Sequence, residues 1–368
     1  MFGTILNTAV ALMHAYVFWR AASVPWIARR VPRKIIIVAA ALLWLLFYLG
    51  REFGRGGAGP LATILELLIM DWMATIFLTT VVLLTTDIVT GFGFFLPRLA
   101  PWLRGLALAA GMIISLVAIV QGMRPPVIRN YEVSLAGLPT ELDGTVVVAV
   151  SDTHLGSLIG KRWAEKLIER VNDQQPDIVL LVGDIFDGHG LDGEGVIPVL
   201  ARLRAPMGVW AVLGNHDSFR RGTADYYIDA GINLLRNTSV EIRPGLVLAG
   251  VDNLRDGGYS GGNENPVAKA LADKPPGATI FLSHKPLQTA LAAQAGVGLM
   301  LSGHTHGGQV WPFGYLVKKR YPLFGGRYQV DGMTMIVSRG AGTWGPRMRL
   351  WRPGEIIRVT LSGTKPEI

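Results

Sequence analysis

The chain has no cysteine, and only 17% of its 368 residues are charged. The absence of cysteine excludes a disulfide framework, a thiolate zinc site and a cysteine nucleophile, so any bound metal must use nitrogen and oxygen ligands. Half of the residues are hydrophobic and the mean hydropathy is +0.36. This composition excludes a disordered chain and argues against an ordinary soluble globule.

The hydrophobic excess lies in the first third of the chain. Four apolar runs there are separated by arginine, glycine and proline, and each is close to the ~20 residues that cross a bilayer as a helix. The runs cover residues 4–19, 35–50, 67–86 and 105–121. They predict a transmembrane helical bundle of about four helices over residues 1–122, and therefore an integral protein of the cell or inner membrane.

The lysines and arginines near the ends of these runs predict the orientation of the bundle. The first loop carries five of them and the third loop two, whereas the second loop and the segment after the fourth run carry two each. Because positive charge is retained on the cytoplasmic side, the first loop is expected in the cytoplasm. With four spans, all residues after about 122 are then extracytoplasmic.

The net charge of +8 does not indicate a nucleic-acid partner. Residues 1–140 contain eleven basic and five acidic residues, so six of the eight excess charges belong to the membrane region and its flanks. Charges in that place serve topology and contact with anionic lipid headgroups. We therefore expect membrane lipids as partners and no nucleic acid, and we infer no obligate protein partner.

The composition changes after residue 122. Residues 123–142 are punctuated by proline and are predicted to form a connector, whereas residues 143–368 alternate apolar strands with polar helical stretches. The strands are expected at residues 145–151, 178–182, 208–213, 246–251, 279–283 and 298–302. This alternation predicts an α/β domain with mixed sheets.

Polar side chains directly follow five of these strands. Strands of an open α/β sheet bind ligands at their carboxyl ends, so the five motifs should converge on one crevice. Converging aspartate, histidine and asparagine make a metal site, and Asp184 is the candidate carboxylate to bridge two ions. The motifs are Asp152-Thr153-His154, Gly183-Asp184-Ile185-Phe186-Asp187, Gly214-Asn215-His216-Asp217, Ser283-His284 and Gly303-His304-Thr305-His306.

Any one of these motifs alone is more often a turn or a helix cap than a ligand. Five of them in order, each after an apolar strand, are not explained as turns, and they contain five of the seven histidines of the chain. The other two, His14 and His189, are expected to be structural or solvated.

The order and spacing of the motifs over residues 152–306 resemble the calcineurin-like metallophosphoesterase family. The resemblance is to its branch with several N-terminal transmembrane helices and a GHTHGGQ sequence, here residues 303–309. It covers about residues 140–362. It implies a sandwich of two mixed sheets flanked by helices, and hydrolysis of a phosphoester with the help of two divalent metal ions.

The resemblance also implies two metal sites that share Asp184. One ion would be held by Asp152, His154, Asp184 and His306. The other would be held by Asp184, Asn215, His284 and His304. Imidazole, carboxylate and amide ligands without sulfur suit Mn²⁺, Fe or Zn²⁺, and the ligand types do not decide among them.

Four further positions take roles from the same resemblance. His216 matches the histidine that contacts the substrate phosphate and protonates the leaving oxygen. Asp187 matches the carboxylate that orients this histidine, and Asp217 would support the ligands from behind. Gly188 stands where the related protein phosphatases have an arginine, which argues against a phosphoprotein substrate.

A segment rich in aromatic, aliphatic and cationic residues follows the last metal motif. Such a mixture is typical of a contact with the membrane interface. In the alternative reading, the aromatic residues belong to the core of a terminal sheet and the cations to its solvated edge. The residues expected to contact lipid or membrane are Trp311, Phe313, Tyr315, Lys318, Lys319 and Arg320.

Three functions remain open. The first is a membrane-bound phosphoesterase that hydrolyses a phosphodiester or pyrophosphate of a lipid or envelope component. The second is the UDP-diacylglucosamine pyrophosphatase of lipid A synthesis, which requires a cytoplasmic catalytic domain, against the charge count. The third is a non-enzymatic membrane scaffold on a phosphoesterase fold, whose expected signature, missing metal ligands, is absent from the sequence.

Overall fold

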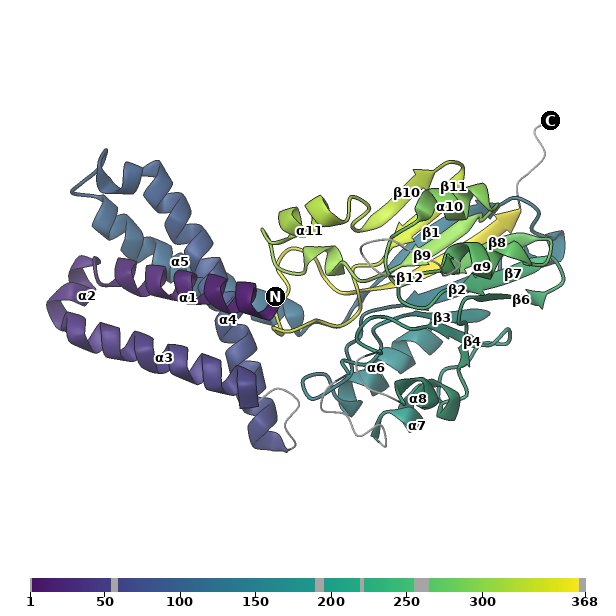
Figure 1. Cartoon of the computed structure of the whole chain (residues 1–368), viewed down its shortest axis with the longest axis horizontal. Helices are drawn as coiled ribbons and strands as arrows, with labels where there is room; N and C mark the ends of the chain where they lie inside the picture. The colour runs from purple at the N-terminus through teal and green to yellow at the C-terminus, as the bar shows by residue number, and fades with distance from the viewer. Residues whose placement is uncertain (1, 54–58, 189–194, 219–221, 255–264, 364–368) are drawn as a thin grey trace. The chain divides into compact units, whose positions relative to one another are not determined.

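The computed structural model describes residues 2–53, 59–188, 195–218, 222–254 and 265–363, so His189 lies outside the described residues. The chain divides into two units. Figure 1 labels the helices and strands of both. The helical unit comprises Met1–Met123 and Gly345–Leu350. The catalytic unit comprises Arg124–Trp344 and Trp351–Ile368.

The helical unit contains the bundle of about four long helices that the sequence predicts. Proline is the first residue of α2 and α4 and the second residue of α5, where its missing N–H costs no hydrogen bond. The helices are α1 (Phe2–Ala21), α2 (Pro25–Arg30), α3 (Arg33–Phe53), α4 (Pro60–Val89), the short η1 (Gly91–Gly93) and α5 (Ala100–Gly122).

Three of these helices, α3, α4 and α5, are long and apolar enough to cross a membrane, counted over the described residues. The sequence predicted a fourth span at residues 4–19. That segment does form a helix, α1, but Asn7, His14 and Arg20 interrupt its apolar character.

A short segment near the C-terminus also belongs to the helical unit. In this return segment, Gly345–Leu350, the backbone N–H of Arg347 donates to Asp71 Oδ1 at 2.8 Å, and that of Arg349 donates to the carbonyl of Ala118 at 2.9 Å. The sequence placed these residues inside the catalytic domain. Nothing in the local pattern marks them, because their partners lie more than 200 residues earlier.

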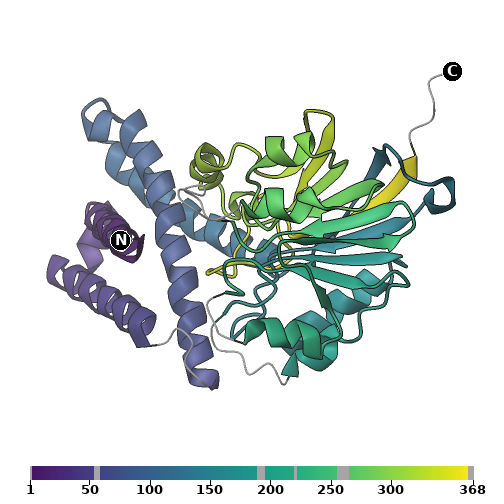
Figure 2. The same cartoon turned by 45° about the vertical axis from the view of Figure 1, so that its right-hand side comes forward.

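The catalytic unit is a sandwich of two six-stranded mixed sheets. The first sheet has the order β1 (Val127–Leu135), β12 (Glu355–Gly363), β2 (Val146–Val150), β3 (Ile178–Val182), β4 (Val209–Val212) and β5 (Asn233–Leu234). The second has the order β10 (Gly326–Val330), β11 (Met333–Val337), β9 (Leu299–Ser302), β8 (Ala278–Leu282), β7 (Leu246–Gly250) and β6 (Thr238–Arg243). Figure 2 shows the strands in a second view. The predicted fold class is confirmed.

Apolar side chains fill the space between the sheets. Alternate residues of a strand face opposite sides of its sheet, so Val147 and Ala149 of β2 point to this inner core. Val148 and Val150 point to the outer core beneath α6 (Lys161–Asn172).

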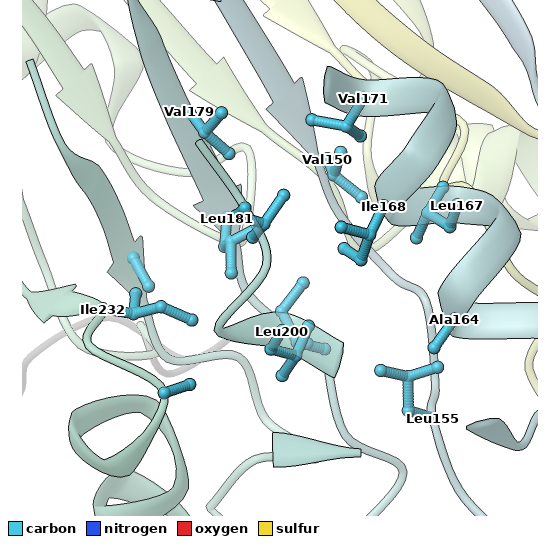
Figure 3. Packing of buried hydrophobic residues seen from close by; sticks show 14 of the residues in the cluster. Val150, Leu155, Ala164, Leu167, Ile168, Val171, Val179, Leu181, Leu200 and Ile232 are labelled. Atoms are coloured by element: carbon cyan, nitrogen blue, oxygen red, sulfur yellow. The ribbon is translucent and has the colours of Figure 1, made fainter. Parts of the chain in front are cut away.

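The outer core shows why α6 is a helix. Ala164, Leu167, Ile168 and Val171 recur with the period of a helical face and pack on β2 and β3 (Figure 3). The short helices α7 (Ile197–Leu200) and α8 (Thr223–Asp229) add to this face. The helices α9 (Pro266–Ala272) and α10 (Thr289–Gln294) cover the outer side of the second sheet.

The segment predicted as a connector, residues 123–142, instead contributes a strand. Residues Val127–Leu135 form β1, which pairs in parallel with β12 over nine residues. Tyr131, Val133 and Leu135 on its inner side alternate with polar residues on its exposed side, which is the pattern of a half-buried strand. Proline at the start of the segment therefore marks the boundary of the helical unit and not a linker.

Candidate metal centre

The five motifs lie where their strands end. In the first sheet, β2, β3 and β4 are parallel neighbours, so Asp152, Asp184 and Asn215 leave the same edge. In the second sheet, β8 and β9 are parallel neighbours, and His284 and the histidines after Gly303 follow them. The six strands predicted from the sequence correspond to β2, β3, β4, β7, β8 and β9. The ends of each lie within two residues of the predicted ends.

The first cluster is formed by Asp152, His154 and His306, all buried. Nε2 of His306 lies 3.1 Å from Nε2 of His154 and 3.4 Å from Asp152 Oδ1. Two imidazole nitrogens and a carboxylate oxygen at such separations can bind one ion. The structure therefore brings together residues that lie 152 positions apart in the chain.

The second cluster is formed by Asp184, His284 and His304. Nε2 of His284 lies 3.1 Å from Asp184 Oδ2, and its Nδ1 faces the carbonyl of Val182 at 2.9 Å. The same Asp184 Oδ2 is 4.0 Å from Nε2 of His154 in the first cluster. Asp184 therefore lies between the two clusters, as expected of a carboxylate that bridges two ions.

The backbone at these residues is strained. Asp152, His154, Asp184, His304 and His306 all have φ between +47° and +70°, in the left-handed region that non-glycine residues avoid. Such conformations cost free energy and persist where function requires a side chain in a fixed direction. These five residues lie in the turns after β2, β3 and β9, and their concentration there supports a functional role for these turns.

Glycines let the turns approach closely. A Cβ at Gly214 would meet the carboxylate of Asp184, and a Cβ at Gly303 would meet that of Asp152. Gly183 has φ +78°, and a Cβ there would lie 2.6 Å from Nδ1 of His284. Any side chain at these three positions would displace a candidate ligand.

The donor set fits divalent ions. Oδ1 of Asn215 is buried and has no hydrogen-bond partner in the described part of the chain, which is costly unless a ligand satisfies it. Burial lowers the pKa of His284, but the neighbouring Asp184 carboxylate outweighs it and raises that pKa to about 9. A field that favours a proton on a buried imidazole also favours a cation beside it.

His216 and Asp187 lie next to the first cluster. Asp187 Oδ1 is 3.4 Å from Nδ1 of His216 and 3.4 Å from Nδ1 of His154. Burial raises the pKa of Asp187, but its hydrogen bonds to the two histidines outweigh burial and hold the pKa well below the usual range. Burial lowers the pKa of His216, but the Asp187 and Asp184 carboxylates raise it above its ordinary value. His216 is therefore protonated more readily than a free histidine.

Asp217 supports the turns from behind. Its Oδ2 accepts hydrogen bonds from the backbone N–H groups of Asp184 and Gly214, both at 2.8 Å, and its Oδ1 accepts one from Phe186 at 2.9 Å. Burial and the nearby charge of Asp184 raise the pKa of Asp217 to about 6. One carboxylate therefore joins the turns after β3 and β4.

Three residues near the site were missed from the sequence. The hydroxyl of Tyr321 lies 3.0 Å from Nε2 of His304. The side chain of Gln309 makes two hydrogen bonds to the backbone of Trp344, whose ring packs against His216. The only sequence signal for Gln309 was its position directly after the GHTHGG residues.

The residues expected to contact lipid lie on and beside α11 (Gly314–Arg320). This helix has no buried residue. Trp311, Phe313 and Tyr315 are 46%, 47% and 70% exposed, and Lys318, Lys319 and Arg320 are exposed in its last turn. These three aromatic residues are therefore not core residues of a terminal sheet, which was the alternative. Tyr321 and Phe324, further along the same segment, are buried.

Comparison with known proteins agrees with this site. The model of the calcineurin-like phosphoesterase family matches residues 145–308. A metallophosphoesterase of Aquifex aeolicus is 35% identical over 247 residues, which are 64% of this chain and 92% of that protein. The chain therefore belongs to the calcineurin-like metallophosphoesterase family.

Two other relatives extend beyond the part that matches. A metallophosphoesterase of Campylobacter jejuni is 32% identical over 67% of this chain and 66% of its own length. A transmembrane protein with metallophosphoesterase domain from Bos taurus is 31% identical over 70% of this chain and 62% of its own length. The chain thus spans somewhat less than two thirds of these relatives. Together with α3, α4 and α5, the second relative indicates a membrane protein.

Proposed function

We propose that this membrane protein hydrolyses a phosphodiester or pyrophosphate bond of a lipid or envelope component. The observation that carries the proposal is the exposed helix α11, which presents aromatic and basic residues and begins eight residues after His306. Exposed aromatic side chains beside cations suit the boundary between headgroups and acyl chains. A lipid phosphoester at that boundary would lie close to the metal centre.

The chain's own residues can carry the reaction. Asp152, His154, Asp184 and His306 would hold one divalent ion, and Asp184, Asn215, His284 and His304 the other. Ions bound there would supply Lewis acidity toward the phosphoryl oxygens and a nucleophile derived from water. We propose Mn²⁺, Fe or Zn²⁺, since all the ligands are nitrogen or oxygen donors.

His216 would donate the proton to the leaving oxygen. The Asp187 carboxylate at 3.4 Å stabilises its imidazolium form and directs Nδ1, which leaves Nε2 to face the substrate. Proton donation by a placed imidazolium contributes roughly 10² to 10⁴ in rate. Asn215 would add a neutral polar contact to a phosphoryl oxygen.

The catalytic unit is proposed to be extracytoplasmic. One side is proposed to be cytoplasmic because of the arginines before α3, Arg33 and Lys34 in its first turn, and Arg98 and Arg104 before and in α5. Three spans put residue 124 on the other side. A C-terminal reporter that is active on one side of the membrane tests this, and a cytoplasmic signal would favour the UDP-diacylglucosamine reaction instead.

The lipid substrate is tested with the full-length protein and two matched variants. Lys318→Gln/Lys319→Gln/Arg320→Gln removes the basic end of α11 and should lower hydrolysis of a phospholipid in anionic vesicles about tenfold, while sparing bis(p-nitrophenyl) phosphate. Lys161→Gln/Arg162→Gln/Lys166→Gln removes three charges from α6 of the same unit and should leave both activities unchanged. Equal loss on both substrates in the α11 variant would reject the lipid proposal.

A further inference from the structure

A group of charged side chains lies at one end of the helical unit. Asp87, near the end of α4, is fully buried. Nε of Arg20, at the end of α1, lies 2.6 Å from Asp87 Oδ2, and Nε of Arg104, in the second turn of α5, donates to Asp87 Oδ1 at 2.8 Å. The hydroxyl of Tyr16 also donates to Oδ2, at 2.6 Å. We call Arg20, Asp87 and Arg104 the basic cluster.

The basic cluster carries one positive charge in excess. The sequence from residue 1 to 123 contains only three other acidic residues, Glu52, Glu66 and Asp71. Glu52 lies at the end of α3 and the other two in the first half of α4, and the sixteen residues from Asp71 to Asp87 correspond to about 24 Å of helix. None of the three can neutralise the second guanidinium.

The two arginines are bound differently. Besides Asp87, Arg104 donates from NH2 to the carbonyl of Phe92 at 3.0 Å and from NH1 to the hydroxyl of Ser23 at 3.5 Å. Arg20 is 6% exposed and meets Asp87 through Nε. It also donates a hydrogen bond to the hydroxyl of Tyr16, and its guanidinium lies 3.8 Å above the ring of Trp19. The Arg104–Asp87 pair is balanced and fixed by backbone and hydroxyl groups, so the excess charge resides on Arg20.

Aromatic side chains surround the cluster at its end of the bundle. Trp19 and Phe92, whose rings approach Arg20, are 61% and 56% exposed, and Phe94, Phe95 and Trp102 are 84%, 70% and 52% exposed. Aromatic side chains of this kind gather at the headgroup level of a bilayer. The excess charge therefore lies at the depth of lipid phosphates, and not in the hydrocarbon.

We propose that Arg20 of the basic cluster binds the phosphate of an anionic phospholipid. A buried charge without a counter-charge destabilises a fold, and the lipid phosphate is the anion that the membrane itself supplies at this depth. The two terminal nitrogens of a guanidinium match two phosphoryl oxygens. Ends of α1 and α4 and the start of α5 meet here, so a bound phosphate would hold three helices together.

The test compares the melting temperature of the full-length protein in detergent with phosphatidylglycerol and with phosphatidylcholine. Anionic lipid should raise the melting temperature of the native protein by about 5 °C over phosphatidylcholine, because it binds the folded state. Arg20→Gln should reduce this difference to about 1 °C or less, while the Arg104–Asp87 pair keeps the bundle folded. The control, Arg98→Gln, removes an exposed arginine at the same end and should keep the full difference.

Two further arms complete the test. Arg20→Lys keeps the charge but loses the planar fork, so it should retain only part of the difference; it also serves if Arg20→Gln does not fold. Inorganic phosphate should not replace the lipid. The proposal is overturned if Arg20→Gln and Arg20→Lys both keep the full difference, if Arg98→Gln loses it equally, or if inorganic phosphate stabilises as well as phosphatidylglycerol.

Discussion

The indole ring of Trp344 stands nearly edge-on to the imidazole of His216, with ring centroids 5.7 Å apart and planes inclined by 67°. The backbone at Trp344 is fixed by one side chain: Nε2 of Gln309 donates to its carbonyl at 3.0 Å, and its N–H donates to Gln309 Oε1 at 2.9 Å. Gln309 follows the candidate ligand His306 by three residues. The side-chain amide of Gln309 therefore holds Trp344, and with it the ring that packs against the proposed proton donor His216, in a fixed position relative to the metal centre.

Gln309→Ala should lower kcat about tenfold and leave the metal content unchanged. The substitution leaves a backbone N–H and a carbonyl of Trp344 without their partner, which costs about 1 kcal/mol or more for each group, and it lets the indole move away from His216. Metal analysis and steady-state kinetics on a soluble phosphodiester measure the two effects. If the variant lost metal together with activity, Gln309 would support the metal ligands and not the position of Trp344.

His216→Ala should reduce turnover by roughly 10² to 10⁴, because the leaving oxygen then departs without a proton. Metal content should stay close to the native value. The structure makes this a sharp question, since the His216 side chain also lies within ligand distance of His154 and Asp184. An empty centre in the variant would make His216 a ligand and would require another proton donor.

Asp187→Asn should move the alkaline limb of the pH–rate profile to lower pH. Burial lowers the pKa of His216, and the Asp187 carboxylate raises it above 6.5 in the native protein. A proton donor acts in its protonated form, so the rate falls as pH rises through this raised pKa, and removing the carboxylate brings the fall to a lower pH. If the maximal rate fell but the alkaline limb stayed at the same pH, Asp187 would have another role than raising the pKa of His216.

Asp184→Asn should empty or disorder both metal sites. Asp184 belongs to the second cluster, and its Oδ2 lies 4.0 Å from Nε2 of His154 in the first. Its Oδ1 also accepts the backbone N–H of His216 at 2.8 Å. A neutral amide cannot supply the bridging charge. Metal analysis should therefore show less than one ion per chain, whereas His304→Ala should spare the Asp152, His154 and His306 cluster. Two ions retained in Asp184→Asn would contradict the bridge.

The parts of the fold that the sequence predicted are those with local signals. Buried strands such as β2 and β3 are unbroken apolar runs, and the motifs after them contain residue types that turns alone do not explain. The sequence could therefore predict that Asp184 lies near the other candidate ligands, as its distance of 4.0 Å from His154 shows. Its role as a bridge between two ions stays a prediction.

The parts that the sequence did not predict depend on distant partners. Strands β1 and β12 pair from Val127 with Glu355 to Leu135 with Gly363, across more than 220 residues. Asp71 lies within α4 and accepts the backbone N–H of Arg347, which follows it by 276 residues. Gln309 likewise contacts backbone atoms of Trp344. Every residue has these atoms, so the type of residue 344 does not predict the contact.

The return segment gives the chain an order of assembly. The polypeptide passes from the helical unit to the catalytic unit at residue 123, returns at residue 345 and leaves again after residue 350. Only then does it reach β12, which lies between β1 and β2 and pairs with both. During synthesis, β12 is made more than 200 residues after β2, so the first sheet is completed only once residues 355–363 have been made.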